Sequence, residues 1–208
     1  MSQSGKNPAG CRQTWREFGL CALLLLVVLV VLFRDGFPAD RTVFANDGPL
    51  GLISSAWARV PAAFTGVWQD TNWLGNGGGI AQPNINGLLE TLVSPLVYSK
   101  IFALFTIFFL GLGAWFCFKQ WKFPAPVCVL GGLAAALNGD FFANSCWGVG
   151  TQQICFGLNF VALGLLADES SSKRWVRVVL AGFAVGLGVS EGFDNGALFS
   201  LVVAAYVI

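Results

Sequence analysis

Apolar residues occur in long blocks separated by short charged segments, a pattern typical of membrane proteins. The blocks predict about six membrane-spanning helices, over 17–33, 100–118, 126–142, 150–167, 176–190 and 196–208. Several blocks are shorter than the roughly 20 residues that a straight span requires, so we expect some helices to be tilted or kinked. The fold class that follows is an all-α polytopic integral membrane protein.

The segment 34–99 interrupts this pattern, because it is too polar to span and too long for a simple connector. Apolar residues recur at helical spacing in 50–64 and 87–98, yet each stretch is too short to cross a bilayer. We therefore predict two amphipathic helices that lie along the membrane surface, with Trp57 at headgroup level. Alternatively, the two stripes form the core of a soluble loop.

The composition agrees with a membrane environment. Of the 208 residues, 55% are hydrophobic and 11% are charged, against roughly a quarter charged in soluble domains. The net charge of +1, without a basic patch interleaved with aromatic residues, gives no basis for nucleic-acid binding. The chain has no histidine and its six cysteines form no CxxC pair, which argues against structural zinc and histidine-based acid–base chemistry.

Lysine and arginine residues in the short connections predict the orientation of the helices. With residues 1–16 in the cytoplasm, eight of the twelve basic residues lie on the inner face: Lys6, Arg12, Arg16, Lys119, Lys122, Lys173, Arg174 and Arg177. In this orientation we read the first span as an uncleaved signal anchor, with a cleaved signal peptide as the alternative. The apolar run continues to Ile208, so we expect further helices beyond it.

Acidic residues show the opposite asymmetry in this topology. Eight of the eleven lie on the outer face: Asp35, Asp40, Asp47, Asp70, Glu90, Asp140, Glu191 and Asp194. Acidic residues contribute little to orientation, so a negatively charged outer site is one explanation. Carboxylates near the hydrocarbon boundary are costly unless they are paired, hydrated or bound to a cation. Candidate site residues are therefore Asp47, Asp140, Glu191 and Asp194.

Structural roles compete with this interpretation. Asp47 precedes Gly48 and a proline before an apolar-periodic run, a pattern that also fits a helix N-cap. Asp140 and Asp194 stand among asparagine and glycine residues that favour turns. Glu191 has no local cap or turn pattern, although a salt bridge to a loop arginine is an alternative.

The order of these features resembles that of the GT-C glycosyltransferases. It combines a cytoplasmic N-terminus, a first span followed by an acidic motif in a long outer loop with surface helices, and an acidic residue after the third span. The stretches 44–49 (Phe-Ala-Asn-Asp-Gly-Pro) and 191–194 (Glu-Gly-Phe-Asp) most resemble bacterial YfhO-like membrane proteins of that superfamily. The resemblance covers most of the chain as a topology and only these stretches as sequence.

The resemblance implies a multi-pass protein of a bacterial inner membrane. It also implies an inverting transfer of a sugar from a polyprenyl-phosphate carrier to an acceptor at the outer membrane face. Asp47 would be the general base toward the acceptor hydroxyl, and Asp140 would position the acceptor or a divalent metal ion. The first motif holds a single Asp instead of a pair of acids, which leaves the metal requirement open.

Positive charge is needed to neutralise the leaving phosphate, whatever the family. Arg41, Arg59 and Lys100 are the candidates for this role, although each also fits an interface anchor. Together with Glu191 and Asp194, they complete the predicted substrate-binding set.

Two other classes of function stay open. A transporter also places acidic residues in glycine-broken helices, although here the acids lie at helix ends and not at the midplane. A non-enzymatic subunit of a membrane complex is the third class, because Gly182-xxx-Gly186 and Gly192-xxx-Gly196 are helix-packing motifs.

Overall fold

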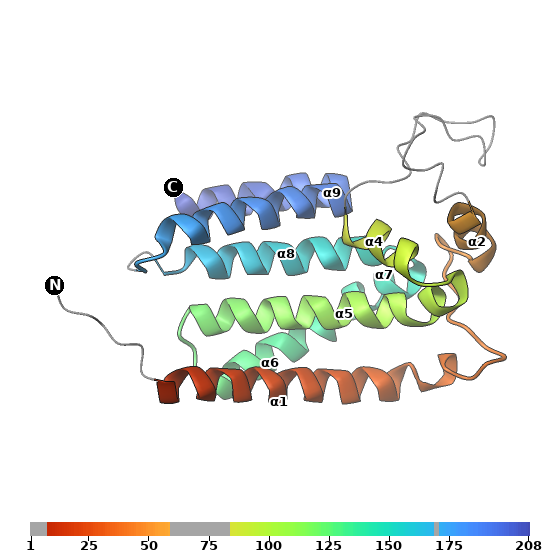
Figure 1. Cartoon of the computed structure of the whole chain (residues 1–208), viewed down its shortest axis with the longest axis horizontal. Coiled ribbons are helices and arrows are strands. Elements are labelled where there is room, and N and C mark those ends of the chain that lie inside the picture. The colour runs from red at the N-terminus through yellow and green to blue at the C-terminus, as the bar shows by residue number, and fades with distance from the viewer. Residues whose placement is uncertain (1–7, 59–83, 169–170) are drawn as a thin grey trace.

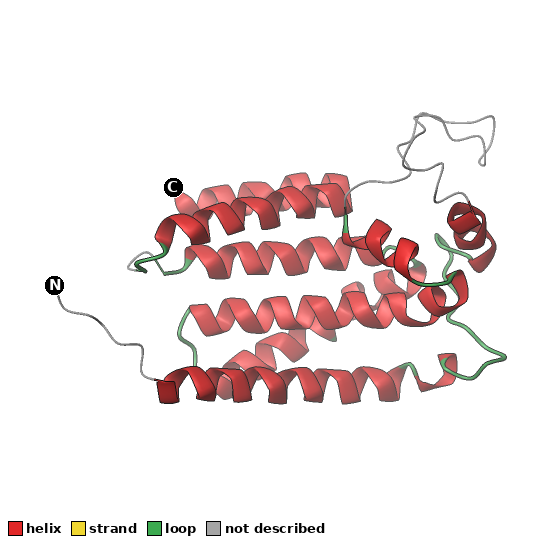
Figure 2. Ribbon diagram, viewed as in Figure 1, coloured by secondary structure: helices red, strands yellow, loops and turns green. Residues whose placement is uncertain are grey.

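The computed structural model describes residues 8–58, 84–168 and 171–208, and within these ranges the chain is helical, without β-strands. The α-helices are α1 (Pro8–Leu32), α2 (Leu50–Ala58), α4 (Ile85–Leu92), α5 (Pro95–Gln120), α6 (Ala125–Ala136), α7 (Gly139–Trp147), α8 (Gly150–Leu166) and α9 (Arg174–Val207). A 3-10 helix, η1 (Arg34–Gly36), follows α1. The long helices run side by side as a bundle, and α2 and α4 gather at one end of it (Figures 1 and 2). The all-α prediction is confirmed for the described part of the chain.

Three described helices are long and apolar enough to cross a membrane: Gln13–Leu32 within α1, α5, and α9. The α6–α7 pair is bent by 46° at a short break and makes a fourth if it counts as one span. Helix α8 is also apolar but has only 17 residues. The chain is thus a multi-pass membrane protein, with three or four spans by helix length where the sequence predicts about six.

Helix α9 consists of two helical arms. Gly192 and Phe193 leave the helical conformation, with φ and ψ of −133° and 36° and of 14° and −85°. Arg177 in the first arm lines the same small cavity as Tyr206 in the second, whereas roughly 30 residues of straight helix would extend about 45 Å. The arms therefore fold back beside each other (Figure 1). The break lies where the sequence predicts the fifth and sixth spans to separate.

Helix α5 lies at the centre of the bundle and packs against α1, α6 and α8. Its contact with α8 brings the two backbones together, because a Cβ placed at Gly113 would lie 2.6 Å from the carbonyl oxygen of Gly157. A side chain at this crossing requires one helix to move, so glycine permits the close approach. This contact fixes the two helices on which the candidate site is built.

One end of the bundle, called here the basic end, collects the basic connections. The start of α1, the α5–α6 and α8–α9 connections and the end of α9 all lie there (Figure 1). Lys119 Nζ lies 2.5 Å from Glu17 Oε2. The Arg177 guanidinium donates to two carbonyl groups at the end of α8 and to the side chain of Gln120. The basic residues of these connections therefore share one face of the protein.

The opposite end, called the α2–α4 end, holds the end of α1, the start of α5 and the bend of α9 (Figure 1). The predicted surface helix 87–98 is divided here, which corrects the sequence interpretation. Ser94 is extended, with φ −65° and ψ 153°, and Pro95 opens α5, because proline lacks an amide that a helix start would leave unpaired. The other predicted surface helix, 50–64, is described as far as Ala58.

Candidate functional site

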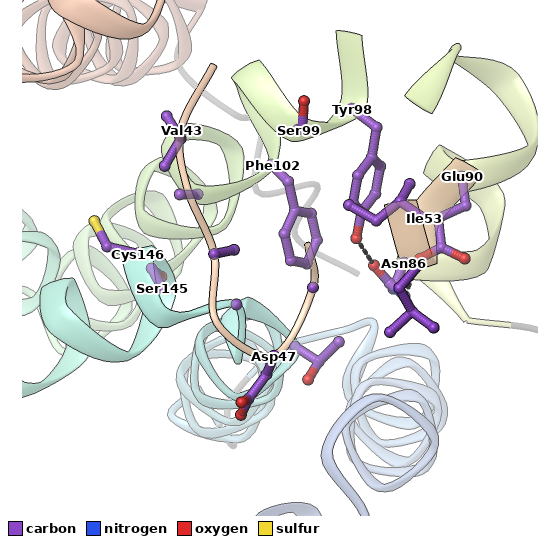
Figure 3. A pocket seen from close by; sticks show the side chains of 16 residues that line it. Val43, Asp47, Ile53, Asn86, Glu90, Tyr98, Ser99, Phe102, Ser145 and Cys146 are labelled. Atoms are coloured by element: carbon purple, nitrogen blue, oxygen red, sulfur yellow. Dashed lines mark hydrogen bonds between the residues drawn. The ribbon is translucent and has the colours of Figure 1, made fainter. Parts of the chain in front are cut away.

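A cavity of about 350 Å³ lies at the α2–α4 end. Its walls come from the segment between η1 and α2, from α2 itself, from α4 and the start of α5, and from the end of α7 and the start of α8 (Figure 3). Among the described residues, the lining contains no lysine or arginine. Its charged and hydrogen-bonding side chains are those of Asp47, Asn86, Glu90, Tyr98, Ser99, Ser145 and Thr151.

The segment between η1 and α2 is held in place by the first turns of α5. Lys100 Nζ donates to the carbonyl oxygens of Phe37 at 3.1 Å and Pro38 at 2.5 Å. The hydroxyl oxygens of Thr42 and Ser99 lie 2.7 Å apart. The sequence makes Lys100 a candidate for phosphate binding, but its ammonium group binds main-chain carbonyls and anchors this segment.

Asp47 lies where the same segment meets the turn between α7 and α8. Its amide donates to the carbonyl oxygen of Trp147 at 3.0 Å, and its Oδ1 accepts from Asn46 Nδ2 at 2.9 Å. Gly148 has a φ of 107°, and a Cβ placed on it would lie 2.8 Å from the nitrogen of Gly48. Glycine is therefore required for both the conformation and the contact. The main chain fixes Asp47 in the cavity lining, while its side chain stays exposed.

Glu90 is the second carboxylate of the lining and lies on α4. It accepts from Asn86 Nδ2 at 3.4 Å, and the Tyr98 hydroxyl donates to Asn86 Oδ1 at 2.5 Å (Figure 3). Burial raises the pKa of the Glu90 carboxyl, and its contacts with Asn86 and Tyr98 oppose this by a smaller amount. The α4 wall is thus linked to α5 through the side chain of Asn86.

Ser145 is a buried hydroxyl residue of the cavity lining. The hydroxyl groups of Ser145 and Thr106 lie 3.0 Å apart, and both residues are buried. Thr106 Oγ1 also lies 3.0 Å from the carbonyl oxygen of Ala103, to which it donates. The Ser145 hydroxyl therefore has a hydrogen-bond partner within the bundle, as buried polar groups normally do.

Glu191 is a predicted substrate-binding residue, but it does not line the cavity. It lies at the bend of α9 with 4% of its surface exposed. Its Oε1 accepts from the backbone amides of Ile85 and Asn86, the latter at 3.2 Å. Asn84 Nδ2 donates to the carbonyl oxygen of Ser190 at 3.3 Å. Glu191 thus binds the first turn of α4, although 106 residues separate it from Ile85.

Asp140 is exposed in the first turn of α7 and is absent from the cavity lining. The expectation that Asp47 and Asp140 share one cavity is therefore not met. Asp47 contacts Trp147 at the C-terminal end of α7, and the seven helical steps from Asp140 to Trp147 extend about 10 Å. The short helix α7, which the sequence joined to the third span, separates the two carboxylates.

The remaining predicted site residues are also outside the lining. Asp194 is exposed beyond the bend of α9, Arg41 Nε lies 3.7 Å from Asp40 Oδ2 in an exposed ion pair, and Arg59 lies outside the described residues. Within the described ranges, no three cysteine or acidic side chains gather in a way that could hold a metal ion. The described ranges therefore supply no further ligands for the metal ion that Asp140 was predicted to position.

The sequence interpretation missed Asn86, Glu90 and Tyr98 as site residues. Asn86 and Glu90 are four residues apart and therefore share one face of α4. The sequence predicted a helix on the membrane surface, and the polar face of such a helix would point to solvent. Their spacing could still have identified Asn86 and Glu90 as a pair of site residues. Tyr98 had no such signal, because its approach to Asn86 depends on the break between α4 and α5.

In comparisons with known proteins, no family model, no curated protein and no solved structure matches the chain.

Proposed function

We propose that this chain is the membrane-embedded part of a GT-C-type glycosyltransferase that works at the outer face of a bacterial inner membrane. The observation that supports it best is the place of Asp47, which lines a cavity with several polar side chains at the end of the bundle opposite the basic end. The positive-inside rule assigns the basic end to the cytoplasm. The cavity then faces outward, at the level where a polyprenyl-phosphate carrier presents its sugar.

The proposal includes six spans. The two arms of α9 count separately because they fold back on each other, and α8 and the α6–α7 pair each contribute one more to α1 and α5. Helices shorter than the hydrocarbon thickness are accommodated when the bilayer thins locally around them.

The cavity lining suits the acceptor better than the donor phosphate. Asp47 and Glu90 are acidic and no lining residue in the described part of the chain is basic, so an anionic phosphate beside these residues would meet like charge. Carboxylate, amide and hydroxyl groups instead match the hydroxyl groups of a sugar acceptor. In this proposal the phosphate lies outside the lining, where Arg41 is exposed.

In the proposed reaction, an acceptor hydroxyl attacks the anomeric carbon of the donor sugar. The hydroxyl proton passes to the Asp47 carboxylate as the new carbon–oxygen bond forms. The bond between the anomeric carbon and the phosphate oxygen breaks, and its electron pair leaves with the polyprenyl phosphate. Attack from the face opposite the leaving group inverts the sugar, and Arg41 stabilises the charge of the departing phosphate.

Asp47→Asn tests the assignment directly. An amide cannot accept the proton, so we expect transfer from a radiolabelled polyprenyl-phosphate hexose to acceptors in an envelope extract to fall by at least about 100-fold. The thermal unfolding temperature should stay near that of the wild type, because the amide of residue 47 still bonds to Trp147. The matched control is Asp140→Asn, which removes a carboxylate outside the cavity and should keep transfer.

Either of two results would remove the proposal. Wild-type transfer by Asp47→Asn would exclude this residue as the base. Equal loss of transfer in Asp140→Asn would show that the cavity does not define the reacting site.

A further inference from the structure

Glu191 is a buried carboxylate that the proposed reaction does not use. An acidic side chain inside an apolar bundle is costly, and here only 4% of the residue is exposed. Its Oε1 accepts the backbone amides of Ile85 and Asn86. Its Oε2 is buried and has no hydrogen-bond partner among the described residues. The contacts of Oε1 identify what this carboxylate does, because these two amides begin α4.

Helix α4 has only 8 residues, too few to be stable without tertiary contacts. The amides of its first turn have no partners within the helix. Glu191 accepts hydrogen bonds from two of these amides, and Asn84 Oδ1 accepts one from the amide of Gly87 at 2.7 Å. Asn84 also donates to the main chain of α9 directly before Glu191. The bend of α9 therefore contributes to both the position and the rotation of α4, together with the contacts of α4 with α2 and α5.

The rotation of α4 decides which side chains reach the cavity. Asn86 is bound at its backbone by Glu191 and at its side chain by Tyr98, and Glu90 follows one turn later (Figure 3). We propose that Glu191 is a positioning residue, which holds α4 so that Asn86 and Glu90 face the acceptor. This proposal rests on the proposed function in one respect, the identity of the acceptor. The hydrogen bonds that join the α9 bend to α4 do not depend on that function.

The test compares Glu191→Ala with Glu191→Gln in the full chain. Glutamine keeps an acceptor oxygen at the α4 amides and removes the charge, whereas alanine removes the acceptor. Hydrogen–deuterium exchange of the peptide covering 85–92 should become about tenfold faster in Glu191→Ala and change less than about threefold in Glu191→Gln.

Transfer kinetics separate positioning from simple loss of stability. With saturating polyprenyl-phosphate hexose and a titrated envelope extract, Glu191→Ala should raise the half-saturating amount of extract about tenfold and change the maximal rate less than about twofold. A variant that only loses folded protein would instead lower the maximal rate. Asn84→Ala removes the second contact between α4 and α9 and should raise the half-saturating amount of extract by a smaller factor. Combined with Glu191→Ala, it should add less than its separate effect, because both act through α4.

Unchanged exchange over 85–92 in Glu191→Ala would overturn the proposal. So would a Glu191→Gln variant with normal exchange and a loss of transfer as large as that of alanine, because the charge would then act on the substrate. If the wild type transfers no sugar, the proposed function fails, and the exchange experiment alone decides whether Glu191 positions α4.

Discussion

Helices α5 and α8 meet in two different ways along their length. Near the middle of the bundle they touch through backbone, and a Cβ at Gly113 would lie 2.6 Å from Gly157. Toward the α2–α4 end, Tyr98 and Phe102 of α5 and Thr151 of α8 line a cavity instead. The closed contact leaves no room for a ligand, whereas the open end can admit one.

The two regions also differ in where their chemistry comes from. The closed contact is made by the two helices alone, but the carboxylates of the cavity come from a connecting segment and from α4, as Asp47 and Glu90 show. Stability and binding should therefore respond to different residues. Changes at the helix contact should lower stability most, and changes in the cavity should act mainly on binding and reaction.

Gly113→Val should have the largest effect on stability. The valine side chain cannot fit beside Gly157 without separating the helices, and overpacking of this kind costs about 1–3 kcal/mol. Thermal unfolding of the detergent-solubilised protein measures the loss. Gly182→Val is the matched control, because a Cβ at Gly182 meets nothing within 4 Å. Equal losses in the two variants would show that the close contact with Gly157 does not set the effect.

Glu90→Gln should change stability less, and in a pH-dependent way. Burial raises the pKa of the Glu90 carboxyl above its ordinary value of 4.5, so the folded state binds this proton more tightly than the unfolded state. Stability should therefore fall as pH rises from about 4.5 to the higher folded value, and stay lower beyond it. Glutamine removes this fall and should make the protein more stable at neutral pH.

Unfolding temperatures measured across the pH range check the behaviour of Glu90. Asp194→Asn is the control for loss of one carboxylate at the same end of the molecule, outside the cavity. A pH slope that persists in Glu90→Gln would assign the titration to another group.

The sequence predicted those parts of the fold that depend on local pattern. Apolar blocks located the bundle helices, and the glycine-rich acidic stretch after Ser190 located the bend of α9. The boundary at Pro95 was missed because the apolar stripe of α4 runs on into α5 without interruption. Apolar periodicity reports which face is buried, and it does not report where one helix ends and the next begins.

The candidate site was harder to predict because its contacts are distant in sequence. Asp47 was identified from the motif around it, and it does line the cavity. Glu191 was identified as costly to bury, but its partners lie on a short helix about a hundred residues earlier. Asp140 was grouped with Asp47 because both follow predicted outward-running spans, and the turn into α7 removes that equivalence.

We expect the cavity to face the outside of the cell, and thiol labelling in intact cells can test this orientation. Phe44 is 79% exposed beside the cavity, and Ser172 is exposed in the connection at the basic end. The reporters Phe44→Cys and Ser172→Cys are introduced separately with Cys11 and Cys146 changed to serine, because the other four cysteines are buried. An impermeant maleimide should label Phe44→Cys in intact cells and Ser172→Cys only after permeabilisation. The reverse pattern would place the cavity in the cytoplasm and contradict the account.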